Sequence, residues 1–572
     1  MPKEMTPSRL KLEIASENDP SFRWVAIALL VLAELMLYTP SLVHGLVADD
    51  FAIREFHNRP LLSLWSQPTD LHGHWRPLSY SFKHVFFSLF SEAAFPWHAI
   101  NVLVHLASVL VFFQILLNLS ESSERKGMIG PLIAAIVFQI HPAAVQNVYW
   151  VSGFSDLLYV LFLLLATRYS LVSMENRKSH FMVWTMVFFT AALFSKEAAI
   201  IFPVFLAFLF RLTIGSWQSV LKLDGRMIGA LSFVSVLFGM AFLSGSGSLL
   251  MKQPGPVTGA LGVFARGFGM LVIPTDAMMI YQVGTESPLV AAGVGALVVL
   301  AIVLILRKKL LNVKMFALFC LVFLAGFSVY VVGGYISLRL MYGSVCFFIM
   351  SMFVALTRRP WWTLPDIFTR ILRWSVAVYV LLVLFFSFSA ALDWHVADKF
   401  AKALRASFVD FHLEAQEKQY VFGAIPSRLR QAEIVGGPDA DFRGELRQSE
   451  ISDSVDLRSL LRIVLLDRDD VSSNVLMIRS SENSLILSTQ TEHQFFLLGR
   501  DIRLRLPVGT RFEDGGYTIE VLETILDSRA ATVRVTARDS ADLNRLLFFD
   551  DQESQFLHLQ EIEALSRDES DE

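Results

Sequence analysis

Long apolar runs separated by short polar loops occupy roughly the first two thirds of the chain. The first run, residues 24–43, is about twenty residues long, which is the length of a helix that crosses a bilayer. It lacks an A-x-A-like cleavage site, so we expect a retained span rather than a signal peptide. Further apolar runs lie at roughly 98–118, 131–149, 154–173, 181–195, 198–212, 227–245, 289–306, 315–334, 342–357 and 374–393. The pattern predicts a polytopic α-helical membrane protein with about eleven spans.

The hydrophobic pattern changes after about residue 395. Residues 393–416 read as an amphipathic helix that leaves the membrane, and short alternating runs follow at 502–506, 518–521 and 532–535. Alternation with a period of two, bounded by Gly-Gly and Asp-rich turns, is typical of β-strands. We therefore expect a small C-terminal β-rich (α+β) soluble domain. The predicted parts are a cytoplasmic tail (1–22), a transmembrane catalytic domain (23–395) with outer loops at 44–97 and 246–288, the β-rich domain (396–560) and an acidic tail (561–572).

Basic residues orient the predicted spans. Pairs or clusters of Lys and Arg recur in alternate loops, at 125–126, 177–178, 222–226, 307–309 and 358–359. Cytoplasmic loops are enriched in Lys and Arg, so the N-terminus and these loops are predicted to be cytoplasmic. The outer side then holds Asp49 and Asp50, His141, Lys196 and Glu197, the 246–288 loop, Arg339 and, with an odd number of spans, the C-terminal domain.

Composition supports this class and excludes others. Hydrophobic residues make up 54% of the chain, above the 45–50% usual for globular proteins. A net charge of -4 gives no case for nucleic acid as a partner. The two cysteines allow neither a disulfide framework nor a Cys-based zinc site. A single N-glycosylation acceptor, Asn118-Leu119-Ser120, falls at a cytoplasmic helix end, which favours a bacterial inner membrane with the active site on the periplasmic side.

Two adjacent carboxylates, Asp49 and Asp50, follow the first predicted span. A carboxylate at a membrane edge can act as general base on an acceptor hydroxyl, and its neighbour can orient the acceptor or hold a metal. The alternative is that both acids mark the hydrated end of a helix. His72 and His74 lie in the same loop, and together with the acids they form a candidate site for a divalent metal. Solvated loop histidines are the alternative, and no cofactor is required by the sequence.

Cations on the predicted outer side are candidates for binding a phosphate group. They are Arg76, Lys196, Arg266 and Arg339, and His74, His141, Asp156 and Glu197 join them as candidate substrate-binding residues. A local Lys196–Glu197 charge pair and snorkelling of Arg339 to the interface are the alternatives. No Gly-rich phosphate loop follows a strand, so a lipid-phosphate sugar donor fits better than a nucleotide sugar. Its leaving group would need cationic stabilisation.

These features resemble the GT-C superfamily of polytopic glycosyltransferases, with bacterial relatives of the transmembrane-and-TPR protein O-mannosyltransferase group as the nearest likeness. The matching elements are Asp49-Asp50, 75–78 (Trp-Arg-Pro-Leu), Asn101 with His105, His141-Pro142, 152–158, 195–197 and 339–342 (Arg-Leu-Met-Tyr). The resemblance implies that a first-loop acid is the catalytic base and that Arg or Lys groups hold a polyprenyl-phosphate sugar donor. Phe154 stands where the family's pattern has Arg, and a β-rich domain replaces the TPR repeats. Acceptor recognition is therefore not carried over from the family, and the acceptor that we predict is an envelope glycan, lipid or protein.

Two rival functions use the same features. A lipid-linked substrate transporter or flippase would use the charged cavity without breaking a bond. Such transporters often contain repeated halves, and no internal repeat is found in this chain. An envelope assembly protein would use the spans as an anchor for its soluble domain. An anchor alone would need neither so many spans nor charges at the membrane edge, so we favour the enzyme.

Overall fold

A computed structural model describes most of the helical part of the chain and the strands of its C-terminal part. The described residues are 20–47, 50, 53–66, 74–120, 125–176, 178–214, 217–245, 267, 269–271, 273–275, 337–357, 366–414, 421–426, 428–429, 432–433, 461–466, 475–481, 483–489, 494–497, 508–509, 511–514, 517–525, 529–537, 547–550 and 555–558. The chain divides into two compact units, one of residues 1–43 and 55–391 and one of residues 44–54 and 392–572.

Helices make up the described part of the first unit. They are α1 (Pro20–Tyr38), η2 (Thr39–Val43), α3 (Ser63–Ser66), α4 (Pro77–Phe90), α5 (Ala94–Leu119), α6 (Arg125–Ile140), α7 (Pro142–Tyr149), η4 (Val151–Gly153), α8 (Phe154–Asn176), α9 (Ser179–Ser195), η5 (Glu197–Ile201), α10 (Phe202–Ile214), α11 (Trp217–Gly245), η6 (Arg339–Met341) and α16 (Tyr342–Thr357). The short helix α2 (Ile53–His57) lies at the boundary between the units, and α17 (Asp366–Glu414) runs through it.

Six described helices are long and apolar enough to cross a membrane. The number rises to seven if the segments 129–140 and 142–149, which meet at a 49° bend, form one broken span. Of the remaining expected spans, the runs at 181–195 and 342–357 are helical but short, and those at 289–306 and 315–334 lie outside the described residues. A mostly helical structure with several candidate spans is therefore confirmed, while the number of eleven spans stays a prediction.

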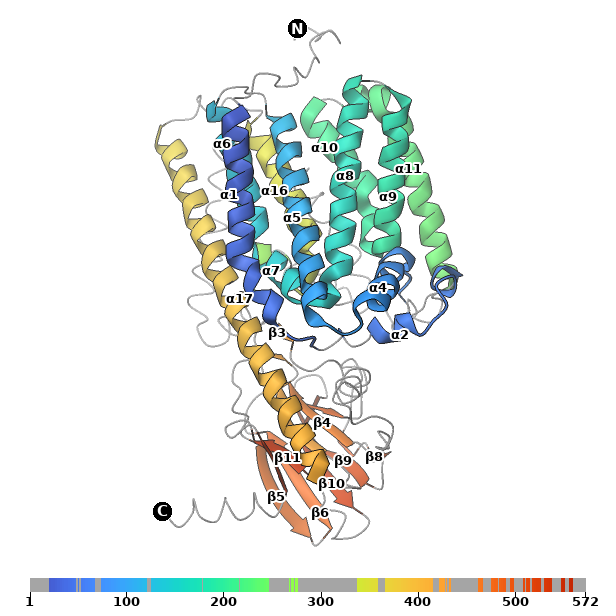
Figure 1. The fold of residues 1–572 in the computed structure, drawn as a ribbon, viewed down its shortest axis with the longest axis vertical. Helices are drawn as coiled ribbons and strands as arrows, with labels where there is room; N and C mark the ends of the chain where they lie inside the picture. The colour runs from blue at the N-terminus through green and yellow to red at the C-terminus, as the bar shows by residue number, and fades with distance from the viewer. Residues whose placement is uncertain are drawn as a thin grey trace. The chain divides into compact units, whose positions relative to one another are not determined.

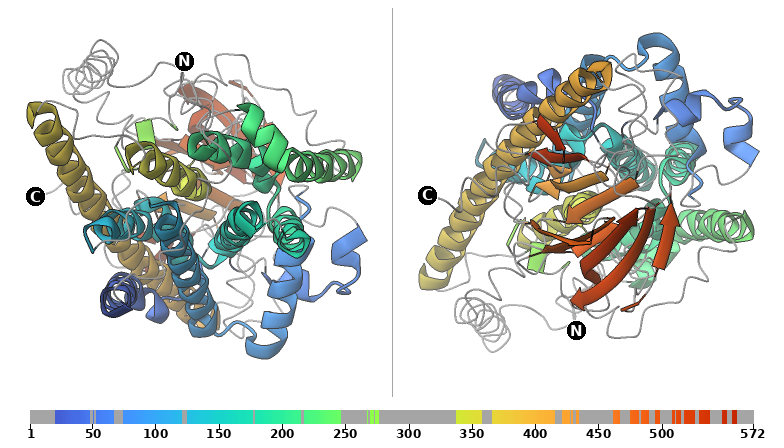
Figure 2. Two further views of the ribbon diagram at one scale, coloured as in Figure 1. Left: turned by 90° about the horizontal axis from the view of Figure 1, so that it is seen from above. Right: turned by 90° about the horizontal axis from the view of Figure 1, so that it is seen from below.

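The long helices lie side by side, as Figures 1 and 2 show for α1, α5, α8 and α9. Aromatic rings fill the space between α5, α6 and α16, where the ring of Phe138 lies 4.9 Å from Phe112 and 5.2 Å from Tyr342. Large apolar side chains, among them Trp24 and Phe233, are exposed on the outward faces. Water does not stabilise so much exposed apolar surface, whereas lipid does.

The chain turns sharply where α6 meets α7. Pro142 begins α7 because it has no N–H to lose at that position, and the Nδ1 atom of His141 caps the helix by accepting the Ala143 N–H at 3.1 Å. The next turn, η4, needs glycine. A Cβ atom at Gly153 would lie 2.4 Å from the Asn147 carbonyl oxygen, closer than any side chain allows. These two turns bring α8 back beside α5 and place its first residues at the same end of the helices as α7.

The second unit contains the described strands. These are β1 (Val421–Pro426), β2 (Arg428–Leu429), β3 (Ala432–Glu433), β4 (Leu461–Leu466), β5 (Val475–Ser481), β6 (Ser484–Thr489), β7 (Gln494–Leu497), β8 (Arg511–Asp514), β9 (Tyr517–Ile525), β10 (Arg529–Ala537), β11 (Leu547–Asp550) and β12 (Gln555–His558). The largest sheet is antiparallel with five strands in the order β5-β6-β10-β9-β8. The alternating runs at 518–521 and 532–535 lie in β9 and β10, and their inward residues Val521 and Val535 are buried.

The last predicted span and the amphipathic helix after it form a single helix, α17. Its sequence holds neither Gly nor Pro, so nothing in it breaks the helical hydrogen bonds between its apolar and charged parts. Within the second unit, Asp398 of α17 accepts the Gly45 N–H at 2.7 Å with one carboxylate oxygen and the Lys402 Nζ at 2.7 Å with the other. The described residues 44–47, which precede the predicted catalytic acids, are therefore fastened to α17 through Gly45.

Candidate functional site

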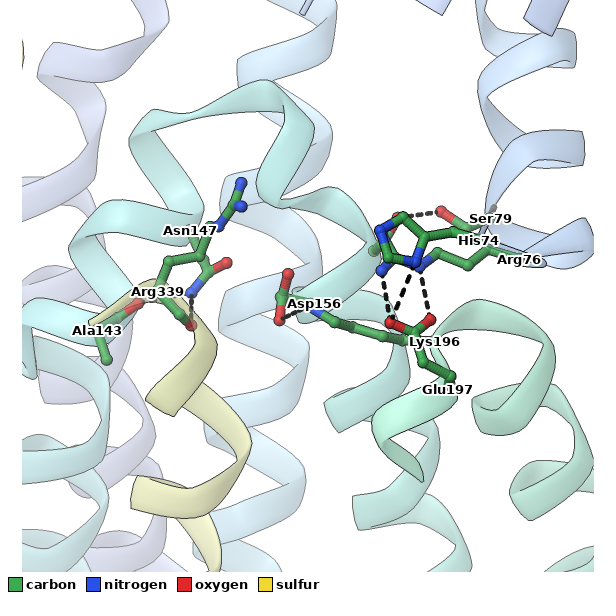
Figure 3. A network of polar contacts seen from close by, with 10 residues as sticks. His74, Arg76, Ser79, Ala143, Asn147, Asp156, Lys196, Glu197 and Arg339 are labelled. Carbon is green, nitrogen blue, oxygen red and sulfur yellow. Dashed lines mark hydrogen bonds and ion pairs between the residues drawn. The ribbon is translucent and has the colours of Figure 1, made fainter. Parts of the chain in front are cut away.

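Charged side chains from four separate segments of the first unit meet at one end of its helices, as Figure 3 shows. Arg76 precedes α4, Asp156 lies in the first turn of α8, Lys196 and Glu197 form the joint between α9 and η5, and Arg339 begins η6. All five are residues that the sequence singled out. Each lies at a helix end, where a membrane span would meet the polar interface.

Arg76 and Glu197 form a bidentate ion pair. The Nε and NH2 atoms of Arg76 lie 2.8 and 2.6 Å from the two carboxylate oxygens of Glu197, and both side chains are largely buried. The Nδ1 atom of His74 lies 3.7 Å from the same carboxylate. Pro77 is the first residue of α4, which fixes the position of Arg76 just before the helix begins. Paired, planar and charge-assisted contacts of this kind are among the strongest in proteins.

Lys196 pairs with Asp156 at 2.5 Å between Nζ and Oδ1, and both side chains are almost fully buried. The alternative of a local Lys196–Glu197 pair does not describe the structure. The backbone at Lys196 is extended, with φ -161° and ψ 135°, so that adjacent side chains point to opposite sides. Lys196 therefore reaches α8 while Glu197 reaches Arg76. Burial lowers the pKa of Lys196 to about 8, although the neighbouring Asp156 raises it.

Arg339 is held differently from the other two cations. Its guanidinium carbon lies 4.1 Å from the ring centroid of Trp150, a cation–π contact. The side-chain amide of Asn147 donates to the backbone carbonyl of Arg339 at 2.9 Å. No residue in the described part of the chain forms an ion pair with Arg339. It is half-buried against an aromatic ring.

Of the remaining predicted residues, the structure describes His141 and Asp50. His141 is buried and caps α7, and its Nε2 atom has no hydrogen-bond partner among the residues described. Asp50 belongs to the second unit, where it is buried and its Oδ2 accepts the Val47 N–H at 3.1 Å. Asp49, His72 and Arg266 lie outside the described residues. Within the described part of the chain, no group of three or more His, Cys, Asp or Glu side chains is arranged to hold a metal ion.

Three residues that contribute to the cluster were not singled out from the sequence. Trp150 supports Arg339, Asn147 fixes its backbone, and the hydroxyl of Ser79 contacts that of Ser155, one residue before Asp156, at 2.5 Å. Asn147 did carry a signal, because a buried amide in an apolar run needs a partner. A tryptophan in such a run is indistinguishable from an ordinary core or interfacial residue.

No family model matches the chain. It is 29% identical over 178 residues to the protein O-mannosyl-transferase Tmtc1 of Drosophila melanogaster, a similarity that covers 29% of this chain. The chain spans 20% of the length of that relative. The similarity is distant and covers less than a third of either chain. Together with the apolar helices, it suggests a membrane glycosyltransferase in general.

Proposed function

We propose that the protein transfers a sugar from a polyprenyl-phosphate-linked donor to an envelope glycan, lipid or protein acceptor, on the periplasmic face of a bacterial inner membrane. The observation that carries the proposal is the cluster of Arg76, Lys196 and Arg339 at one end of the apolar helices. Such a cluster suits a phosphate group attached to a lipid, because the lipid chain stays in the bilayer while its headgroup meets the cations. The similarity to Tmtc1 supports transfer rather than transport.

The charge balance of the cluster fits this class of donor. Among the residues that the structure describes here, Glu197 and Asp156 neutralise Arg76 and Lys196, so that Arg339 supplies one net positive charge. A sugar–phosphate–lipid diester carries about one negative charge, and the lipid phosphate that leaves carries nearly two. The cations therefore stabilise the departing phosphate more than the bound donor, which is the condition for lowering the barrier.

The proposed base is the acid pair that follows the first span. Asp49 removes the proton of the acceptor hydroxyl while the oxygen of that hydroxyl attacks the anomeric carbon of the donor sugar. The bond between that carbon and the phosphate oxygen breaks, and the electron pair leaves with the lipid phosphate. Asp50 is assigned as the partner of Asp49, because its carboxylate and its own N–H close a turn on Val47, at 3.1 and 3.0 Å.

Arg339→Gln tests the function directly. In proteoliposomes supplied with polyprenyl-phosphate sugars and envelope extract, the variant is expected to release lipid phosphate about 10²–10³-fold more slowly, the usual effect of removing one donor to a developing anion. Arg211→Gln is the matched control, since Arg211 lies in the last turn of α10, at the other end of the span that begins with Glu197. No donor consumption by the wild type, with donor crossing the bilayer intact, would identify a flippase instead.

The rate is also expected to depend on pH through Lys196. Its pKa is lowered to about 8, so Lys196 is charged below that pH and loses its proton above it. We expect kcat/KM for the donor to fall as the pH rises through about 8, because this constant reports the free enzyme. The side chain stays charged in Lys196→Arg, so kcat/KM should no longer decrease above pH 8. The control Lys178→Arg should still show that decrease. A wild-type profile that is flat from pH 7 to 9.5 would contradict a role for the Lys196 charge.

A further inference from the structure

Two buried polar residues of α5 have no part in the proposed chemistry. Asn101 and His105 are one helical turn apart, so they lie on the same face of the helix. Both are fully buried inside a helix long and apolar enough to span a membrane. Polar side chains in such a position are expensive unless their hydrogen bonds are satisfied, so their partners indicate what they do.

The amide of Asn101 fixes the segment that supports Arg339. Its Nδ2 atom donates to the carbonyl oxygens of Trp150 at 2.9 Å and of Asn147 at 3.2 Å. Trp150 carries the ring on which the Arg339 guanidinium rests, and Asn147 donates to the Arg339 carbonyl. One side chain of α5 therefore holds both Asn147, in the last part of α7, and Trp150, which follows that helix.

The imidazole of His105 fixes the other side of Arg339. Its Nε2 lies 3.1 Å from the carbonyl oxygen of Gln139, and its Nδ1 lies 2.8 Å from the hydroxyl of Tyr342. A carbonyl only accepts, so the neutral ring carries its proton on Nε2 and the Tyr342 hydroxyl donates to Nδ1. Tyr342 follows η6 directly, and its backbone N–H donates to the Arg339 carbonyl.

We propose that Asn101 and His105 are positioning residues that hold Arg339 in place for the phosphate of the lipid-linked donor. Arg76 and Lys196 are each oriented by a carboxylate, which also neutralises them. Arg339 keeps its charge for the ligand because neutral groups orient it instead: an aromatic ring and hydrogen bonds to its backbone. A cation fixed in advance stabilises developing charge without reorganising during the reaction. The identity of the ligand rests on the proposed function, while the positioning does not.

The positioning is tested by the rate at which phenylglyoxal modifies Arg339, measured by mass spectrometry on the full-length protein in nanodiscs. Tyr342→Phe removes the hydroxyl that links α16 to His105, and Asn101→Leu removes the amide at nearly constant volume. Each is expected to raise the modification rate about fivefold, the factor that corresponds to one net hydrogen bond. Tyr379→Phe is the matched control, because the Tyr379 hydroxyl donates to the carbonyl of Leu271 at 3.0 Å, a contact separate from those that orient Arg339.

An unchanged rate in Tyr342→Phe, or an equal rise in Tyr379→Phe, would overturn the proposal. Tyr342→Phe remains decisive if Asn101→Leu does not fold, because it deletes a single oxygen atom. A second arm adds farnesyl phosphate, an isoprenyl monophosphate, to the wild type. Protection of Arg339 by farnesyl phosphate would support the phosphate-binding role. If the variants are modified faster but farnesyl phosphate gives no protection, the positioning role stands and the proposed class of donor is rejected.

Discussion

Asp49→Asn is expected to lower the rate of sugar transfer by about 10²–10⁴-fold, the range that general acid–base catalysis contributes. Asn has nearly the shape of Asp but cannot take the proton of an acceptor hydroxyl. The measurement is release of lipid phosphate and formation of glycosylated acceptor in proteoliposomes. Equal yield, oligomeric state and melting temperature of variant and wild type establish that membrane insertion is intact. Transfer at the wild-type rate by Asp49→Asn would remove Asp49 from the mechanism.

Asp50→Asn is the matched comparison, since it makes the same chemical change at the neighbouring residue. Asn retains an oxygen that accepts the Val47 N–H, so the turn closed by Asp50 is preserved. If Asp50 serves the turn, its variant keeps transfer within about tenfold of wild type while Asp49→Asn does not. The reverse result would exchange the two roles. Normal transfer by both variants would exclude the acid pair as the base.

Much of the helical architecture follows from the apolar runs, because a span must satisfy its own backbone hydrogen bonds and face lipid with apolar side chains. The runs at 98–118 and 154–173 appear as α5 and α8, with boundaries a few residues away. The single helix α17 was also foreseeable, since no residue between 374 and 414 interrupts it. Alternation in 518–521 and 532–535 predicted strands, but the sheet order β5-β6-β10-β9-β8 depends on pairing between distant residues.

The ion-pair partners in the candidate site could not be predicted from the sequence. Loop parity grouped Arg76, Lys196 and Arg339 on one side, because each lies at the corresponding end of a span. It could not choose their partners, since Asp156 is 40 residues from Lys196 and Glu197 is 121 residues from Arg76. Proximity in sequence offered a Lys196–Glu197 pair as one alternative, and the extended backbone at Lys196 directs the two side chains apart.

Variants of the Lys196–Asp156 pair are expected to separate the effect of the pair on stability from its effect on sugar transfer. Removing one partner of a buried ion pair leaves an uncompensated charge, which costs about 3–5 kcal/mol. Asp156→Asn and Lys196→Met should therefore each lower the melting temperature sharply and abolish transfer. The double variant Lys196→Met, Asp156→Leu removes both charges and should regain most of the stability, because apolar residues of similar volume often replace a buried pair without loss.

Regained stability without regained transfer would show that Lys196 is kept for the donor and not for the fold. A double variant that transfers sugar at the wild-type rate would make the pair structural only. Asp156→Asn should also change how stability depends on pH. Asp156 raises the pKa of Lys196, so its loss lowers that pKa further. Above that lowered value the unfolded chain binds more protons than the folded one, so the stability of the variant rises with pH. We therefore expect the melting temperature of Asp156→Asn to increase from pH 7 to 9, and a decrease would mean that burial does not lower the pKa of Lys196 in the variant.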